Sequence, residues 1–356
     1  MSGGRAERVE ARLAEAEVDL LLVTDLTNVR YLTGFTGSNG LVVTGPGVRR
    51  FVTDFRYVEQ AGRQVAGFEV ERAPQEFLAA LERGWRGGAV RLGFEDHKVT
   101  VRQHARLREL LPERVELVAA GGLVERERAV KDAAEVAAIR AAAELADEAL
   151  GDVLDAGLVS RTEREIALEL EQAMRRRGAE PAFPSIVAAA AHGALPHARP
   201  TDDPVPADTL VTIDWGARLD GYCSDCTRTV ATGEPGEELR AIYDLVLRAQ
   251  LAALDAVRPG PEGREVDAVA RELIAAAGHG DHFGHGLGHG VGLEVHEAPR
   301  LSVTGEDALE AGNVVTVEPG VYVPGTGGVR IEDLVVVSGG GRDVLSGRSK
   351  DLLTVG

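Results

Sequence analysis

The sequence contains very little cysteine: Cys223 and Cys226 are the only two thiols in 356 residues. A disulfide framework is therefore excluded as the source of stability, and a reducing cytosol is the expected compartment. The sequence also lacks an uncharged apolar run near the roughly 20 residues that a membrane helix requires. Its first residues alternate in charge and show no apolar core of a signal peptide. We expect a cytoplasmic protein that does not bind membranes.

The sequence also has fewer positively charged than negatively charged residues. Lysine and arginine total 39 against 57 aspartates and glutamates, which gives a formal net charge of −18. Nucleic acid is therefore not an expected partner, because a basic surface supplies most of the affinity for it. The apolar content of 44% is ordinary for a globular protein, and the length predicts two domains.

Residues 1–124 are predicted to form the smaller domain, of mixed α/β type, because short helical and strand patterns alternate there. Residues 28–40 are rich in glycine and are interpreted as a loop. Two glycines at 121–122, followed by a charged stretch at 125–131, mark the domain boundary. The helical patterns cover 6–16, 56–66, 75–83 and 101–110, and the strand patterns cover 18–24, 41–44, 50–53, 90–94 and 115–118.

Residues 125–356 are predicted to form the larger domain, which makes the whole chain α+β. Thr162 and Glu165 form a possible capping box at the start of a helix. The order of elements suggests two similar halves, each with a helix pair followed by strands. The helical patterns cover 132–154, 162–177, 237–257 and 265–277, and the strand patterns cover 186–190, 209–216, 222–229, 314–317 and 329–337.

The segment 285–297, His-Gly-Leu-Gly-His-Gly-Val-Gly-Leu-Glu-Val-His-Glu, is the most informative feature that is present. Imidazole is the side chain best suited to bind a metal or to move a proton near neutral pH. Glycine lets the backbone approach a ligand closely and adopt positive φ. A packed core needs neither, so we predict a site whose glycines give access to it.

Two acids flank the turn signal at residues 219–221. If the loop is 219–220, Asp214 and Asp225 pair directly, and if it is 220–221, they are diagonal neighbours. Both registers place the two carboxylates on one face, whereas a three-residue loop would separate them. Like charges on one face repel, and a divalent cation would remove that cost. The alternative is a solvated hairpin face.

Two further acids, Glu318 and Glu332, lie within β-branched apolar runs, where an isolated charge is costly to bury. An edge-strand position for Glu318 and a surface pair of Glu332 with Arg330 are the alternatives. Several carboxylates with one or two imidazoles favour a hard ion such as Mn²⁺ over a structural zinc. These carboxylates and imidazoles are more ligands than one catalytic ion with an open coordination position needs. A pair of ions bridged by carboxylates would fit this number of ligands.

These motifs resemble those of the pita-bread metallopeptidases of the Xaa-Pro aminopeptidase and Xaa-Pro dipeptidase (prolidase) group. The resemblance is strong over residues 125–356 and looser over 1–124, where the segment 28–40 carries it. It implies a C-terminal pita-bread (creatinase/aminopeptidase-like) catalytic domain, two divalent ions with Mn²⁺ ahead of Co²⁺ or Zn²⁺, and a homodimer. The positions that match the metal ligands of this family are Asp214 in Asp-Trp-Gly, Asp225 in Ser-Asp-Cys-Thr-Arg-Thr, His289 in the segment 285–297, Glu318 in Glu-Pro-Gly, and Glu332 in Gly-Val-Arg-Ile-Glu-Asp.

The same resemblance implies further site residues. Three histidines are expected to contact the substrate or the transition state, an arginine to lie beside the last ligand, and two aromatic residues to line the substrate pocket. A turn residue and plain core residues are the alternatives for the first histidine and the two aromatics. These positions are His197, His285 and His296, then Arg330, then Phe183 and Tyr322.

The implied reaction is hydrolysis of the bond between an N-terminal residue and proline by metal-activated water, with proline-containing peptides as substrates. Glu318 would accept the proton, and a metal with His285 or His296 would stabilise the oxyanion. A prolidase, a small-amide hydrolase and a non-catalytic interaction module are the alternatives.

Two other clusters are not expected to bind the catalytic metals. Cys223 and Cys226 face opposite sides of a strand, because they are three residues apart. His279 and His282 are interpreted as part of a loop near the site.

Overall fold

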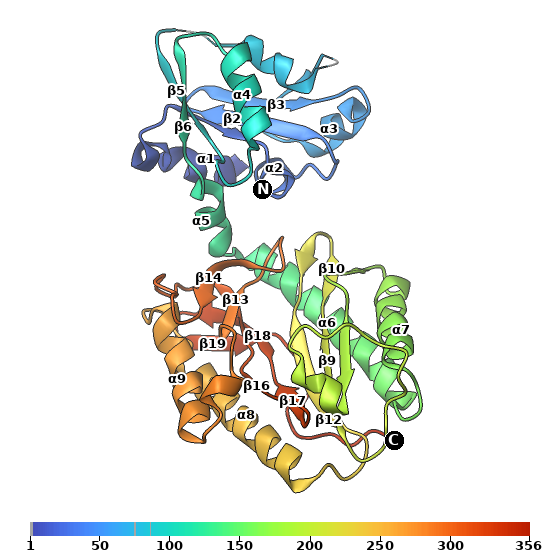
Figure 1. Ribbon diagram of the computed structural model, residues 1–356. Coiled ribbons are helices and arrows are strands. Elements are labelled where there is room, and N and C mark those ends of the chain that lie inside the picture. Colours follow the sequence, from blue (N-terminus) through green and yellow to red (C-terminus); the bar gives the residue numbers. More distant parts are fainter. Residues whose placement is uncertain (1–2, 75, 86) are drawn as a thin grey trace. The chain divides into compact units, whose positions relative to one another are not determined.

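The computed structural model of the chain describes residues 3–74, 76–85 and 87–356. The chain forms two compact units, residues 1–128 and 129–356, and both contain helices and sheets (Figure 1). This confirms the predicted α+β class. The sequence placed the division after residue 124, and the structure places it within helix α5, Leu123–Ala129. Among the described residues, no helix is long and apolar enough to cross a membrane.

The N-terminal unit is built on one mixed sheet in the order β4-β3-β2-β1-β5-β6. Strand β1 pairs antiparallel with β2 and parallel with β5, which confirms a mixed α/β domain. Residue 75, the first of the predicted helix 75–83, lies outside the described residues. The elements are α1 (Gly3–Ala11), η1 (Leu13–Ala16), β1 (Leu20–Val23), α2 (Leu26–Thr33), β2 (Gly40–Gly45), β3 (Val48–Thr53), α3 (Val58–Gln64), β4 (Glu69–Arg72), η2 (Phe77–Glu82), β5 (Val90–Phe94), α4 (Val101–Leu110) and β6 (Val115–Ala119).

The predicted loop at 28–40 is wrong in its first half, where the chain forms helix α2. Asp25 caps this helix, because its carboxylate accepts hydrogen bonds from two backbone amides of the first turn. Gly34 ends the helix in the left-handed region, with φ of 79°. The glycine that suggested a loop is therefore a helix terminator.

The C-terminal unit contains two helix pairs, and each pair packs on antiparallel strands (Figure 1). Helices α6 and α7 cover the sheet β12-β9-β8, and helices α8 and α9 cover strands β15 to β18. The elements are α6 (Ala133–Asp155), α7 (Glu163–Arg176), β7 (Glu180–Pro181), β8 (Ile186–Ala189), η3 (Ala190–Ala194), β9 (Leu210–Trp215), β10 (Ala217–Leu219), β11 (Tyr222–Cys223), β12 (Cys226–Ala231), α8 (Glu237–Ala256), α9 (Gly263–Ala276), η4 (Gly280–His282), β13 (Gly288–Gly290), β14 (Glu297–Leu301), β15 (Val314–Val317), β16 (Gly320–Val323), β17 (Gly327–Arg330), β18 (Asp333–Ser338) and β19 (Gly341–Val344).

The hairpin that carries the two aspartates has the second of the two predicted registers. Its loop is Asp220–Gly221, and both residues have positive φ, of 47° and 85°, as a type I′ turn requires. Further along the ladder Asp214 pairs with Thr227, so Asp225 is the diagonal neighbour of Asp214. Both aspartates therefore come from one face of the hairpin.

Two strands that the sequence predicted as continuous are interrupted. The segment 222–229 breaks between β11 and β12, and the segment 329–337 breaks between β17 and β18. Asp225 and Glu332 lie in these breaks, and Glu318 lies directly after β15. Three of the four candidate acids thus lie at the ends of strands or between two strands.

Candidate metal centre and active site

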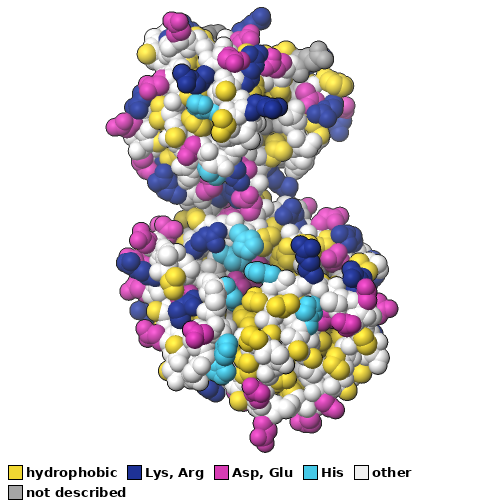
Figure 2. All heavy atoms as spheres, viewed as in Figure 1, with side chains coloured by type: hydrophobic (Ala, Val, Ile, Leu, Met, Phe, Trp, Pro, Cys, Tyr) yellow, Lys and Arg dark blue, Asp and Glu magenta, His cyan; other side chains and the backbone are white. Residues whose placement is uncertain are grey.

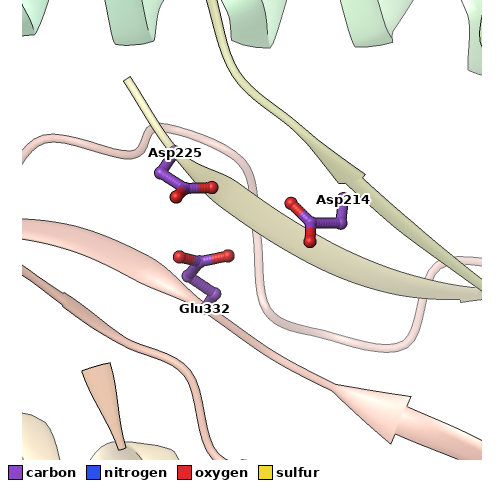
Figure 3. Close-up of side chains that lie close together, drawn as sticks. All are labelled: Asp214, Asp225 and Glu332. Carbon is purple, nitrogen blue, oxygen red and sulfur yellow. The ribbon is translucent and has the colours of Figure 1, made fainter. Parts of the chain in front are cut away.

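Three carboxylates from separate segments meet inside the C-terminal unit (Figure 3). Single oxygens of Asp214, Asp225 and Glu332 lie within 4.8 Å of one another. Within the described part of the chain, one oxygen of Asp214 and one of Glu332 are buried without a hydrogen-bond partner. Such atoms are costly to bury. The cluster is therefore suited to a positively charged partner that the side chains do not supply.

Burial and mutual repulsion dominate the electrostatics of this cluster. Burial, together with the charges of neighbouring acids, raises the pKa of Asp225 and the pKa of Glu332 well above their usual range. Burial also raises the pKa of Asp214, although Arg330 opposes that effect. Each raised pKa means that the folded protein disfavours the charged carboxylate. A divalent cation would reverse this, and a set of carboxylates with an imidazole fits a hard divalent ion.

Arg330 lies beside this cluster, and it is itself buried. Its guanidinium donates to Asp214 Oδ2 at 2.7 Å, to Thr227 Oγ1 at 3.0 Å and to the Tyr322 hydroxyl at 2.9 Å. A surface pair of Arg330 with Glu332 is therefore wrong, because both side chains are buried and the arginine pairs with Asp214.

His289 and Glu318 extend the cluster on the other side. His289 Nε2 lies 3.3 Å from Glu318 Oε1 and 3.6 Å from Asp225 Oδ2. Its Nδ1 faces the Gly290 carbonyl at 3.1 Å, and because a carbonyl only accepts, Nδ1 carries the hydrogen and Nε2 faces the acids. Burial alone would raise the pKa of Glu318, but His289 lowers that pKa to about 2. The edge-strand alternative for Glu318 is wrong, since β15 lies between β13 and β18.

The glycines of the segment 285–297 serve packing in addition to access. A Cβ atom at Gly288 would lie 2.0 Å from the Thr316 carbonyl oxygen, and one at Gly290 would lie 2.1 Å from that of Ala298. Neither glycine has a positive φ. Glycine therefore has a second role at these two positions, where it lets β13 fit between β14 and β15.

A cavity of about 630 Å³ opens onto the acids. Nine of the predicted site residues line it, and the two others, Tyr322 and Glu332, are buried and are not part of the lining. On the face shown in Figure 2, most visible histidine side chains (cyan) lie on the C-terminal unit. The predicted residues that line the cavity are Phe183, His197, Asp214, Asp225, His285, His289, His296, Glu318 and Arg330.

Two histidines of the cavity, the partly exposed His285 and the exposed His296, differ in their surroundings. His285 Nδ1 lies 2.7 Å from the Gly286 carbonyl, and its Nε2 lies 2.9 Å from the Tyr322 hydroxyl. In the neutral ring, Nε2 therefore accepts from Tyr322. The ring of His296 lies 4.2 Å from that of His289, centroid to centroid. Burial lowers the pKa of His285 and the pKa of His296, so both rings are held neutral.

The sequence reasoning missed several residues that line the cavity. Arg199 and Arg300 bring positive charge to it, and Ser185 brings a buried hydroxyl without a partner among the described residues. Arg199 follows His197 by two positions, and Arg300 follows His296 by four, so proximity to the motifs was an available signal. Cys226 and Cys223 belong to two different apolar clusters, and burial raises the pKa of each thiol.

The fold and the site together define a metal-dependent hydrolase: buried carboxylates and one imidazole face a cavity that contains further histidines. Residues 137–339 match the metallopeptidase family M24, and residues 5–130 match the creatinase/prolidase N-terminal domain. The chain belongs to metallopeptidase family M24, whose members bind divalent metal.

Similar proteins extend along the whole chain. An Xaa-Pro dipeptidase from Pyrococcus horikoshii is 35% identical over 94% of this chain and 95% of its own length. The structure of an Xaa-Pro dipeptidase from Bacillus anthracis covers 100% of both chains, with a TM-score of 0.95 and 38% identity. That of an X-Pro aminopeptidase from Thermotoga maritima covers 99% of this chain and 100% of its own, with a TM-score of 0.89 and 33% identity. The expected pita-bread fold is thus confirmed, and a non-catalytic module is disfavoured.

Proposed function

We propose that this metallopeptidase is an Xaa-Pro dipeptidase that uses two divalent ions, with Mn²⁺ favoured over Co²⁺ and Zn²⁺. The observation that carries the proposal is the cluster of three carboxylates in which, among the described residues, one oxygen of Asp214 and one of Glu332 are buried without a hydrogen-bond partner. When bound, the ions supply Lewis acidity that activates a water molecule near neutral pH. The residues proposed to hold them are Asp214, Asp225, His289, Glu318 and Glu332.

The proposed proton acceptor is Glu318, because its pKa is lowered while burial raises the pKa of each neighbouring acid. His289 lowers the pKa of Glu318 to about 2, so the carboxylate is free of a proton near neutral pH. Its Oε1 also accepts a hydrogen bond from Thr316 Oγ1 at 2.9 Å, which orients it. The proton it takes from water would pass to the leaving proline nitrogen.

The oxyanion of the substrate needs a hydrogen-bond donor, and we assign this role to His296 ahead of His285. The neutral His285 accepts at Nε2 from Tyr322, so its remaining nitrogen offers no proton to the substrate. Tyr322 in turn is held by Arg330. We therefore propose that His285, Tyr322 and Arg330 position the substrate and the acid cluster, and that His197 contacts the substrate at the cavity wall.

A dipeptide substrate is favoured over a longer peptide by the charges of the cavity. A dipeptide ends in a carboxylate directly after the proline, and Arg199 and Arg300 offer guanidinium groups that pair well with carboxylates. Phe183, Pro184 and Pro196 provide an apolar wall for the proline ring. The names of the relatives from Pyrococcus horikoshii and Bacillus anthracis support the same choice over the aminopeptidase that the sequence placed first.

The test is kcat/KM of the Mn²⁺-loaded enzyme for Ala-Pro and for Ala-Pro-Ala. We expect Ala-Pro to be preferred by roughly 10–100-fold, the equivalent of one charge-assisted hydrogen bond. R300Q should reduce this preference, and R258Q, at an exposed arginine that does not line the cavity, should leave it unchanged. Preference for Ala-Pro-Ala would establish the aminopeptidase, and activity on small amides alone would overturn both.

We further propose a cytoplasmic homodimer in which residues 125–356 catalyse and residues 1–124 form the creatinase/prolidase-like domain. The two reduced, buried cysteines support the compartment. The match of residues 5–130 to a separate domain type supports the division of labour.

A further inference from the structure

Two histidines outside the catalytic cavity lie in direct contact. His279 Nδ1 and His282 Nδ1 are 3.0 Å apart, and their ring centroids are 5.2 Å apart with the planes at 47°. Neither residue lines the cavity described above. Both rings are partly exposed, so solvent reaches them. The sequence predicted only a loop here. In the structure, the Nδ1 atoms of the two rings lie next to each other.

The spacing of the two nitrogens fits two ligands of one metal ion. With metal–nitrogen bonds of about 2.0 Å, two ligands at a right angle are about 2.8 Å apart, and two at a tetrahedral angle about 3.3 Å apart. The observed separation lies between these values. A proton shared between the two rings would occupy the same space, and a metal ion would replace it.

The backbone that carries the pair is fixed from both sides. The amide of His279 donates to the Ile274 carbonyl of helix α9, and the amide of His282 donates to the His279 carbonyl. After the pair, Phe283 is buried, and Arg271 lies 4.3 Å above its ring while donating to its carbonyl at 2.9 Å. The site is therefore held in place before any ion binds, which limits the entropy lost on binding.

We propose that His279 and His282 form a separate binding site for a late transition-metal dication, of the Ni²⁺, Cu²⁺ or Zn²⁺ kind. Two imidazoles favour these ions over Mn²⁺, whereas the catalytic acids favour the harder ion. Water fills the remaining coordination positions, since the rings are partly exposed. The enzyme thus carries two kinds of metal site that differ in ligand chemistry, and the second does not depend on the proposed peptidase reaction.

The test is calorimetric titration of the Mn²⁺-loaded enzyme with Ni²⁺, with the Mn²⁺ content measured before and after. We expect one Ni²⁺ to bind per chain without release of Mn²⁺. H279Q and H282Q should each weaken this binding by at least about tenfold, because the second imidazole binds as an intramolecular ligand. H104Q removes a histidine of the N-terminal unit and should bind Ni²⁺ as the unsubstituted enzyme does.

Two results would overturn the proposal. One is Ni²⁺ binding of unchanged strength in both H279Q and H282Q, and the other is release of one Mn²⁺ for each Ni²⁺ bound. The thermal unfolding midpoint of each variant, measured without Ni²⁺, confirms that the fold is retained.

Discussion

Two adjacent acids of the C-terminal unit, Glu332 and Asp333, are equally buried and have opposite surroundings. Their exposed fractions are 1% and 0%. Asp333 accepts from Arg228 Nη2 at 2.8 Å and from Gln250 Nε2 at 3.0 Å, and it also pairs with Lys350. Glu332 accepts from Thr227 Oγ1 at 2.7 Å, and its other oxygen has no partner in the described part of the chain.

The surroundings of Asp333 and Glu332 show how a structural acid can be distinguished from a functional one. Asp333 faces two cations, so its charge is compensated within the fold. Glu332 faces other carboxylates, and burial raises its pKa well above the usual range. Both acids are buried, and what differs is the sign of the neighbouring charges. An acid whose compensation is missing from the chain is a candidate for binding a cation.

The largest expected effect is on the stability of the metal-free protein, and it separates the two acids. D333N should lower the free energy of unfolding by about 3–5 kcal/mol, because it leaves the buried Arg228 and the partly exposed Lys350 beside a neutral amide. E332Q should be neutral or stabilising, because it removes a charge that the metal-free fold disfavours. Urea unfolding in the presence of a chelator, followed by the fluorescence of Trp215 in a W85F background, measures both.

Added Mn²⁺ sharpens this contrast. It should stabilise the W85F protein and D333N more than E332Q, because only E332Q lacks a proposed ligand. Equal destabilisation by D333N and E332Q without metal would contradict the comparison, because it would show that the metal-free fold stabilises both charges to the same extent.

The next largest effect is on catalysis. E332Q should lower kcat/KM for Ala-Pro by at least about 100-fold, or about 2.7 kcal/mol, since even an outer partner of a metal ligand can cost that much. D343N, at an exposed acid of strand β19, is the matched control and should retain full activity. Activity of E332Q within a few fold of the unsubstituted enzyme would remove Glu332 from the metal centre.

Much of this site could be predicted from the sequence, because the relative positions of the two aspartates follow from local strand and turn geometry. Strand alternation and the Asp220–Gly221 turn were sufficient to place Asp214 and Asp225 on one face. The roles of the five ligands came from resemblance and stay predictions. The position of Glu332 in a strand break was not predictable, since the run of β-branched residues from 329 to 337 conceals the interruption.

Long-range compensation was equally out of reach of the sequence. Asp333 meets Arg228 across 105 residues, and no local pattern couples the two. The helix at 26–33 was not predicted for a different reason. Its local signals, the capping Asp25 and the terminating Gly34, are present in the sequence, but the glycine-rich composition of 28–40 was interpreted as a loop.

The smallest expected effect concerns a third environment, in which dipoles rather than cations compensate an acid. Glu163, at the start of α7, accepts from the amides of Ala189 and Thr201 at 2.8 and 2.9 Å and contacts His192 Nδ1 at 2.9 Å. Burial alone would raise the pKa of Glu163, but these hydrogen bonds lower it below the usual value. The folded protein therefore favours the charged form, which adds stability above the unfolded pKa and loses it as the pH falls through the folded pKa.

E163Q should accordingly lower the free energy of unfolding by roughly 1–3 kcal/mol at pH 7, the range for hydrogen bonds to a charged group. The deficit should shrink as the pH falls below the pKa of an unfolded glutamate and through the lower pKa of Glu163 in the folded protein, where its carboxylate takes up a proton. E144Q, at an exposed glutamate of α6, should show no such dependence. If the difference in unfolding free energy between E163Q and the unsubstituted protein is constant from pH 7 to pH 3, the charge of Glu163 does not contribute to stability. Glu163 would then not be an acid whose charge is compensated by dipoles, intermediate between Asp333 and Glu332.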